Sequence, residues 1–132
     1  MPTIFSRIIS GDIPSYKIAE DECFFAFLDI NPIVKGHTLV IPKVETDQLF
    51  DLPQELLSGI LPFSQPIAQA LKNVFQVNRC GLTVMGLEVP HAHLHLLPIN
   101  SEKDMNFSNP KLRLSKEEFL EIQSRILAQL NR

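Results

Sequence analysis

Histidine alternates with apolar residues at residues 91–97, and this alternation constrains the fold more than any other feature of the chain. Three of the four histidines of the sequence lie here, at His91, His93 and His95. Successive side chains of a β-strand point to opposite faces, so a strand would place these three imidazoles on one face. The apolar residues between them would face a core: Ala92, Leu94 and Leu96. We therefore predict a strand over residues 91–98 that presents three imidazoles together.

Hydrophobic periodicity and turn residues predict the remaining elements. Further strands are predicted at residues 16–19, 22–29, 37–41 and 80–85, and helices at residues 4–10, 51–75 and 116–130. Pro62 and Pro66 each remove a backbone hydrogen bond from the long central helix, so we expect a kink or break near residues 61–65. Residues 86–90 are predicted to be a tight connection between two strands. The pattern indicates an α+β fold with a five-stranded, mostly antiparallel sheet and flanking helices.

Composition narrows the class of protein. The chain has 132 residues, the size of one domain, and we expect a single domain over residues 1–132. Its net charge of −3 argues against a nucleic-acid-binding protein. Two cysteines are too few for a disulfide framework, no apolar run is long enough for a membrane span, and the first ten residues lack a signal-peptide pattern. We therefore expect a cytoplasmic protein without a membrane partner.

Three interpretations of the histidine cluster remain open at this point. The rings can be buried, hydrogen-bonded core residues with no chemistry. They can be ligands of a catalytic zinc ion, since three histidines with an open position form a known zinc site. They can perform nucleophilic and acid–base chemistry at phosphorus, because a neutral imidazole is a nucleophile and its neighbours can donate hydrogen bonds. No glycine-rich phosphate loop occurs in the sequence, so histidines and backbone amides would have to hold a phosphate.

The segment His91-Ala92-His93-Leu94-His95-Leu96-Leu97 resembles the signature of the histidine triad (HIT) family. The likeness extends over roughly residues 3–100, and residues 101–132 form a C-terminal extension with its own helix. Three further segments are similar to family motifs: residues 4–14, 27–32 and 36–43. All four histidines fall on motif positions, including His37 in the last of these segments.

The resemblance implies a nucleotidyl hydrolase or transferase that cleaves a nucleoside 5′-phosphate from its leaving group, either an amine or a second nucleotide. By this likeness His93 is the nucleophile and forms a covalent nucleotidyl-histidine intermediate. His95 would hydrogen-bond the phosphate, while His91 and His37 would position the nucleophile and support proton movement. The resemblance implies no cofactor and no catalytic metal, and it implies a homodimer.

The same resemblance assigns residues to the substrate. The carboxylate of Asp29 would bind the two ribose hydroxyls. An apolar pocket for the base, which we expect to be a purine, would be lined by Phe5, Ile8, Phe27 and Ile30. We also place Glu88 and Val89, just before the triad, among the substrate-binding residues.

The chain departs from the family pattern before the triad, where Gly86 is followed by Leu87 and Glu88 in place of Gln and a hydroxyl residue. A carboxylate beside a phosphate is unfavourable unless it is protonated or paired. We therefore hypothesise that Glu88 favours a cationic leaving group, such as a lysine amide.

A second departure concerns zinc. Some bacterial relatives bind structural zinc through C-x-x-C near the first helix and a histidine after the third strand. Thr3, Ser6 and Glu45 stand at these positions here, so we predict no structural zinc.

Two other functions remain open beside the hydrolase. The chain can be a nucleotide-binding sensor or interaction module with little turnover, which the altered segment before the triad favours. It can also be a histidine-ligated metalloenzyme, which chelators would inactivate.

Overall fold

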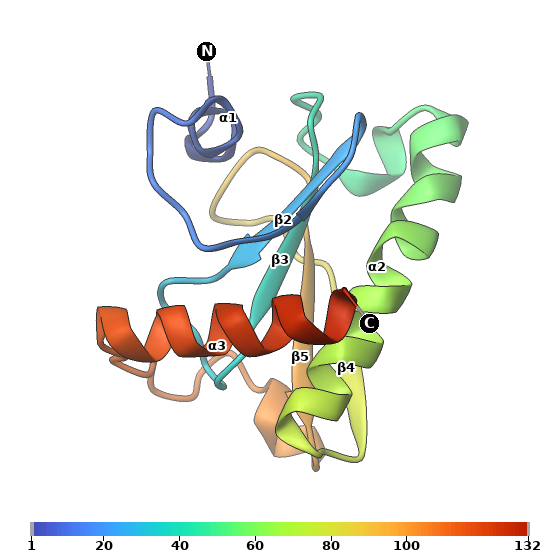
Figure 1. Ribbon diagram of the computed structural model, residues 1–132. Coiled ribbons are helices and arrows are strands. Elements are labelled where there is room, and N and C mark those ends of the chain that lie inside the picture. Colours follow the sequence, from blue (N-terminus) through green and yellow to red (C-terminus); the bar gives the residue numbers. More distant parts are fainter. Residues whose placement is uncertain (1, 132) are drawn as a thin grey trace.

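Five strands form one antiparallel sheet in the order β1-β2-β3-β5-β4, in a computed structural model that describes residues 2–131 (Figure 1). The strands are β1 (Lys17–Glu20), β2 (Phe24–Leu28), β3 (Thr38–Pro42), β4 (Arg79–Thr83) and β5 (Leu94–Ile99). The helices are α1 (Ile4–Ser10), α2 (Gln54–Phe75) and α3 (Lys116–Leu130), with short 3-10 turns at Leu49–Asp51 and Glu102–Met105. The predicted α+β class and five-stranded sheet are confirmed. Residues 1 and 132 of the expected domain lie outside the described residues.

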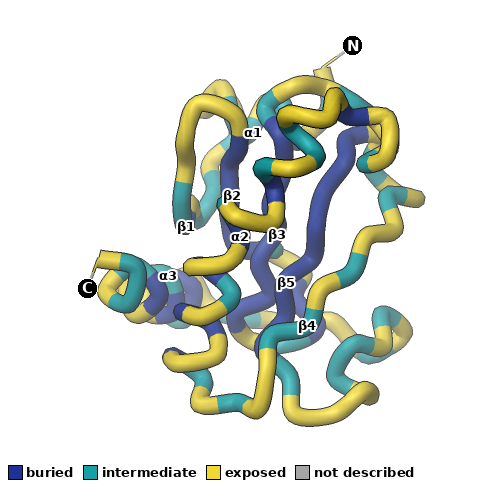
Figure 2. Tube along the Cα trace, turned by 90° about the vertical axis from the view of Figure 1, so that its right-hand side faces the viewer, coloured by how far each residue is buried: buried dark blue, intermediate teal, exposed yellow. Residues whose placement is uncertain are grey.

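The main hydrophobic core lies between one face of the sheet and the helices α2 and α3. Alternate residues of the central strands enter it, among them Phe24, Ala26 and Leu28 of β2 and Leu94 and Leu96 of β5. Figure 2 shows that β2, β3 and β5 are buried, whereas β4 at the edge is partly exposed. Three central strands buried on both faces can therefore hold polar side chains away from water on the face opposite this core.

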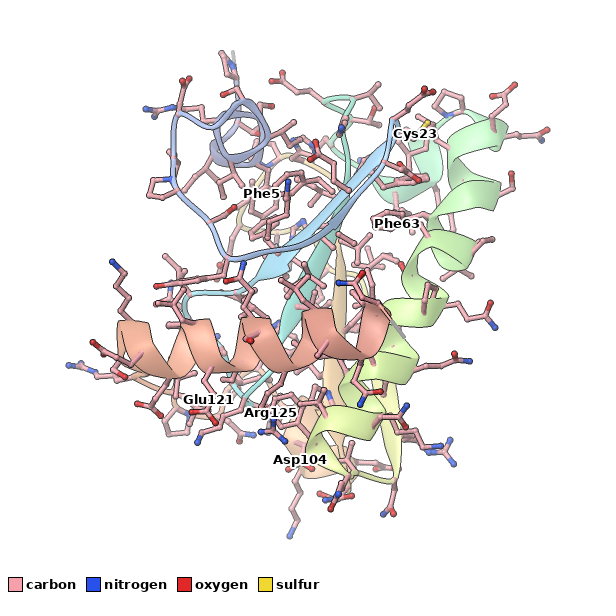
Figure 3. The ribbon with its side chains drawn as sticks, viewed as in Figure 1. Phe5, Cys23, Phe63, Asp104, Glu121 and Arg125 are labelled. Carbon is pink, nitrogen blue, oxygen red and sulfur yellow. The ribbon has the colours of Figure 1, made fainter. Side chains whose placement is uncertain are left out.

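Helix α1 covers part of that opposite face. Thr3 caps its first turn by accepting a hydrogen bond from the Ser6 amide, and Gly11 ends it at a positive φ of 87°. In Figure 3 Phe5 extends from α1 towards the sheet, where it is buried against Phe25 and Phe27 of β2. These strand residues share a face, as the alternation of the sequence predicted.

Helix α2 is continuous from Gln54 to Phe75, so of the predicted kink or break near residues 61–65 the break does not occur. Pro62 and Pro66 lie on the exposed side of the helix, where water can satisfy the carbonyl groups that lose an amide partner. The predicted start at Asp51 is also wrong, because a 3-10 turn ends there and α2 begins after Pro53. Although α2 has 22 residues, no helix among residues 2–131 is long and apolar enough to cross a membrane.

Strand β5 begins at Leu94, three residues later than predicted. Strand β4 ends at Thr83, which pairs with His95, so residues 84–93 form a loop longer than the predicted tight connection. The backbone of this loop bonds outside the sheet: the Ala92 amide donates to the Thr46 carbonyl at 2.7 Å. His91 and His93 therefore precede the strand, and only His95 of the triad lies within it.

The C-terminal helix is held to the end of α2 by an arginine. Arg125 of α3 donates from its guanidinium to the carbonyl of Val74 at 2.7 Å and lies 5.9 Å from the centre of the Phe75 ring (Figure 3). A cation at the carboxyl end of a helix is favourable, because the last carbonyls have no amide partner. This contact fixes the region from which the chain turns into β4.

Candidate active site

All four imidazoles gather on the sheet face that α1 partly covers. Antiparallel pairing of β3 with β5 sets Leu39 opposite His95 and so brings His37, just before β3, beside His95. The side chains of all four histidines are buried, with no more than 8% of any residue exposed. Buried imidazoles require partners for their nitrogens, and these partners define which nitrogen carries hydrogen.

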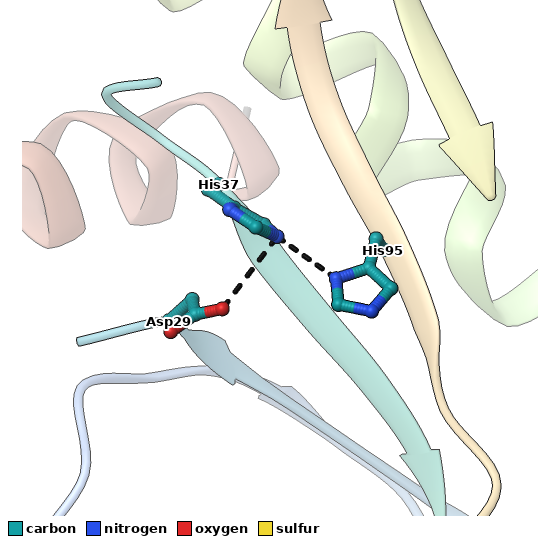
Figure 4. A group of neighbouring side chains, drawn as sticks. All are labelled: Asp29, His37 and His95. Atoms are coloured by element: carbon teal, nitrogen blue, oxygen red, sulfur yellow. Dashed lines mark hydrogen bonds and ion pairs between the residues drawn. The ribbon is translucent and has the colours of Figure 1, made fainter. Parts of the chain in front are cut away.

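The tautomer of His37 follows from its backbone partner. The Ile33 amide donates to His37 Nδ1 at 3.3 Å, so the neutral ring carries its hydrogen on Nε2. That nitrogen lies 2.9 Å from His95 Nδ1 and donates to it (Figure 4). His95 then carries its own hydrogen on Nε2, which is left to donate to a ligand. A relay of two hydrogen bonds thus fixes His95 as a donor.

His93 carries its hydrogen on the other ring nitrogen, Nδ1. Its Nδ1 lies 2.7 Å from the carbonyl oxygen of His91, and a carbonyl can only accept, so Nδ1 carries the hydrogen. The Nε2 atom of the neutral ring therefore keeps its lone pair and is a nucleophile. Its ring centre lies 4.9 Å from that of His95, which places donor and nucleophile side by side.

Burial keeps these rings neutral. It lowers the pKa of His37 to about 4 and that of His95 to about 3, and it also lowers the pKa of His93. Removal of water disfavours the charged imidazolium, and neighbouring histidines add to the effect. Near pH 7 the site therefore contains an uncharged nucleophile and an uncharged hydrogen-bond donor.

His91 anchors the site to α1. Its Nε2 donates to the Pro42 carbonyl at 2.8 Å, so its Nδ1 accepts from the hydroxyl of Thr3, also at 2.8 Å. The hydroxyl of Thr3 in turn accepts from the Ser6 amide, and the Ser6 hydroxyl donates to the carboxylate of Glu45. This bond to Ser6 lowers the pKa of Glu45. The hydrogen bonds to Pro42 and Thr3 fix the ring of His91, and the backbone carbonyl of the same residue orients His93.

The residues at the zinc position of relatives are thus together in space, but they do not fit zinc. Thr3 and Ser6 offer neutral hydroxyls, whereas structural zinc sites use thiolates and imidazoles. Both nitrogens of His91 already have partners in the Pro42 carbonyl and the Thr3 hydroxyl. A chain of hydrogen bonds from Glu45 through Ser6 and Thr3 to His91 engages these side chains with one another.

Asp29 stands at the end of β2, close to the histidine relay. Its Oδ1 accepts from the Asn31 amide at 2.8 Å, and its Oδ2 lies 3.6 Å from His37 Nε2 (Figure 4). Potential ligand atoms of Asp29, His37 and His95 lie within 4.8 Å of one another. A metal ion would need the lone pair of His37 Nε2, so the hydrogen of the neutral ring would have to move to Nδ1. There it would point at the hydrogen of the Ile33 amide, and the bond between them would be lost. The trio is therefore better suited to hydrogen bonding than to metal binding.

Three of the four residues expected to line a base pocket, Phe5, Ile8 and Phe27, lie in one apolar cluster. Phe5 and Phe27 pack edge-on with ring centres 5.6 Å apart, and half-buried Ile8 and Val89 pack against the same cluster. Ile30 is 63% exposed and lies outside this cluster. The structure thus brings Phe5, Ile8, Phe27 and Val89 together and leaves Ile30 at the surface.

The loop before the triad is open to solvent. Leu87 is 91% exposed, and the side chain of Glu88 is also exposed. The negative charge of Glu88 acts to raise the pKa of His93 and so partly opposes the effect of burial. Glu88 thus acts on His93 through its charge, and its side chain makes no hydrogen bond to any described residue.

Sequence reasoning missed Phe107 and Lys111. The ring of Phe107 packs edge-on against His95 and His37, with centres 4.9 and 5.7 Å away, and the Lys111 amine lies 5.7 Å from the centre of Phe107. Phe5 packs in the same way against His93 and His91, at 5.0 and 5.7 Å. One signal was present: Phe107 is the only aromatic residue in the polar segment 101–114.

Comparison with known proteins gives consistent matches. The family model for the HIT domain matches residues 10–102. The adenosine 5′-monophosphoramidase of Saccharomyces cerevisiae is 41% identical over 101 residues, which are 76% of this chain and 64% of that protein, so the chain spans less than two thirds of this relative. The adenosine 5′-monophosphoramidase of Schizosaccharomyces pombe is 37% identical over 89% of this chain and 90% of its own length.

A solved structure resembles the whole fold. A zinc-bound histidine triad family protein from Mycobacterium smegmatis superposes with a TM-score of 0.82 and 33% identity, over 97% of this chain and 92% of the other. The likeness therefore includes the C-terminal extension, beyond the residues that the family model matches.

Proposed function

Since the chain belongs to the HIT domain family, we propose that it is a hydrolase that cleaves nucleoside 5′-phosphoramidates into a nucleoside 5′-monophosphate and an amine. One observation carries the proposal: the bond from His93 Nδ1 to the His91 carbonyl leaves Nε2 unprotonated beside the donor Nε2 of His95. Two relatives that are 41% and 37% identical are adenosine 5′-monophosphoramidases, which supports this substrate class.

In the proposed reaction, His93 Nε2 attacks phosphorus and the bond from phosphorus to the amine breaks. This forms a nucleotidyl-histidine, while the Nε2 hydrogen of His95 bonds a phosphoryl oxygen. The departing amine takes up a proton from solvent, and the proton that the attacking water later releases returns to solvent. Water then attacks phosphorus and gives up a proton, the bond to His93 breaks, and the neutral ring is restored. The net reaction consumes one water.

The remaining residues have binding roles in the proposal. The Oδ2 of Asp29, at the open end of the relay, would accept from the ribose hydroxyls. Phe5, Ile8, Phe27 and Val89 would contact the base, which we propose to be a purine. Ile30, at the surface, would close the outer side of the base.

A second candidate is favoured by Glu88, whose charge lies close enough to influence His93. A fixed negative charge repels a phosphate, so a nucleotide-binding module with slow turnover is the alternative. The two candidates differ in turnover and not in binding.

The test is hydrolysis of adenosine 5′-phosphoramidate, an adenylated lysine amide and a diadenosine polyphosphate, each with a chelator present. We expect turnover of the amides, loss of turnover in His93→Ala, and an adenylyl group trapped on the unaltered protein by a denaturing quench at alkaline pH, where the bond from phosphorus to a histidine nitrogen survives. Binding of adenosine monophosphate without turnover would support the module instead. Inactivation by the chelator would support a metalloenzyme, and near-normal activity of His93→Ala would overturn the proposed chemistry.

We also propose a homodimer that acts in the cytoplasm. The edge strand β4 and the following loop expose Leu82, Val84 and Met85 (45%, 37% and 46%), and unpaired edges with apolar side chains favour association. Sedimentation at micromolar concentration tests the dimer. We further propose that residues 1–132 act as one unit, because the extension contributes Phe107 to the site.

A further inference from the structure

The segment 106–112 is fixed against the active site rather than extending into solvent. The Leu112 amide donates to the carbonyl of Pro32 at 2.7 Å, which ties the segment to the loop between β2 and β3. The Asn109 side chain donates to the Lys103 carbonyl, also at 2.7 Å. Phe107 then packs edge-on against the buried rings of His95 and His37. The segment forms one wall of the histidine relay.

Three of the four histidines bring no positive charge to this site. His37, His93 and His95 are neutral near pH 7 because burial lowers the pKa of each ring. The charged groups acting on His93 include Asp29 and Glu88, both of which are negative. A phosphate, a phosphoramidate or a transition state at phosphorus is an anion, so it gains no charge stabilisation from these residues.

Lys111 places a positive charge beside Phe107 on this wall. Its amine lies 5.7 Å from the centre of the Phe107 ring, within the range of a cation–π contact, and that ring contacts His95. Among residues 2–131, no ion pair involves Lys111. Its charge nevertheless reaches the relay, since it acts to lower the pKa of both His37 and His95.

We propose that Lys111, held by Phe107, is the cationic subsite that binds the substrate phosphate beside His95. The inference rests on the proposed function and deepens it, because it assigns phosphate charge recognition to the C-terminal extension. Lys111 lies outside residues 10–102, so this subsite is a feature that the family match does not contain. Arg in place of Lys111 would preserve the charge and the contact with the aromatic ring.

The test separates charge recognition from recognition of the nucleoside. Binding of adenosine and of adenosine 5′-monophosphate is measured by calorimetry in the full-length unaltered protein, in Lys111→Gln, in Lys111→Arg and in the control Lys103→Gln. Lys103 lies on the same extension and is exposed, and its replacement removes the same charge. We expect Lys111→Gln to weaken binding of the monophosphate about tenfold at low salt and to leave adenosine binding unchanged.

Lys111→Arg and Lys103→Gln should bind both compounds like the unaltered protein. The loss in Lys111→Gln should shrink as salt is added, because screening weakens the exposed charge. Equal weakening of adenosine and monophosphate binding, or no weakening of either, would overturn the inference. Hydrolysis by the unaltered protein tests the proposed function separately, so a failure of the subsite and a failure of the activity give different results.

Discussion

His37 and His95 form one hydrogen-bonded pair, in which His37 Nε2 lies 2.9 Å from His95 Nδ1 although the residues are 58 positions apart. Burial lowers their pKa values to about 4 and about 3. Histidines of an unfolded chain titrate near pH 6.5, so below that pH the unfolded state binds more protons than the folded state. The contribution of this neutral pair to the free energy of unfolding is complete above pH 6.5 and is lost as the pH falls from there through about 4 for His37 and about 3 for His95.

We expect this pair to lower the free energy of unfolding by about 2–3 kcal/mol between pH 6.5 and pH 5. Urea unfolding at several pH values measures the change. The matched control carries His37→Gln and His95→Gln, which remove both titrating groups and leave the acidic residues. Its stability should depend less on pH over the same range, and identical slopes in the two proteins would show that the pair is not the cause.

Thr3→Val should destabilise the protein by about 1–2 kcal/mol, since it removes the cap of α1 and the donor to the buried His91 ring. It should also lower kcat more than it raises KM, because His91 holds the nucleophile through its carbonyl. Thermal unfolding and steady-state kinetics measure both effects. Thr3→Ser keeps the hydroxyl and should restore both properties; a stable and active Thr3→Val protein would contradict the role of this contact.

Gly36→Ala should lower the free energy of unfolding by about 2–4 kcal/mol. Gly36 has a φ of 88°, and a Cβ atom there would overlap the ring of Phe75. Gly11→Ala is the control, because its φ of 87° is similar but nothing lies within 4 Å of the added carbon. The control should cost about 1 kcal/mol, which is the backbone effect alone. Equal losses in the two variants would show that contact with Phe75 is unimportant.

Elemental analysis of protein purified without added metal should find no stoichiometric zinc. The hydroxyls of Thr3 and Ser6 are poor zinc ligands. A triple variant with Thr3→Cys, Ser6→Cys and Glu45→His would supply soft ligands around His91 and should gain about one zinc per chain. Stoichiometric zinc in the unaltered protein would overturn the prediction.

Glu88→Ser should reduce the preference for a cationic leaving group. The exposed carboxylate acts on His93 electrostatically, so it also attracts a cation that departs from phosphorus there. The ratio of kcat/KM for an adenylated lysine amide to that for a diadenosine polyphosphate measures the preference. We expect this ratio to fall several-fold, and an unchanged ratio would remove Glu88 from leaving-group selection.

The sequence predicted those parts of the fold that local pattern determines. The start and the end of helix 116–130 were both predicted correctly, because Ser115 and Glu118 form a capping box and the apolar residues repeat at helical spacing. The sequence predicted a kink or break in α2 because proline removes a hydrogen bond from a helix interior; no break occurs, and the freed carbonyls lie on the exposed side of the helix. Exposure of one helix side is decided by packing of the whole chain.

The candidate site was predictable to a similar degree. Alternation in residues 91–97 identified the three histidines, yet their tautomers depend on backbone groups such as the Ile33 amide and the His91 carbonyl. Lys111 carried no local signal, because its position depends on the bond from Leu112 to the Pro32 carbonyl. Such long-range contacts are absent from any pattern of neighbouring residues.

Phe5 of the first helix packs against His93, and Phe107 of the C-terminal extension packs against His95. Local opening of α1 or of residues 106–112 would admit water to imidazoles that are neutral because they are buried. A bound nucleotide would stabilise both segments, so amide hydrogen exchange in α1 and in residues 106–112 should slow together on binding. Proteolytic loss of the first five residues would then remove Phe5 and abolish the activity while most of the sheet stayed folded.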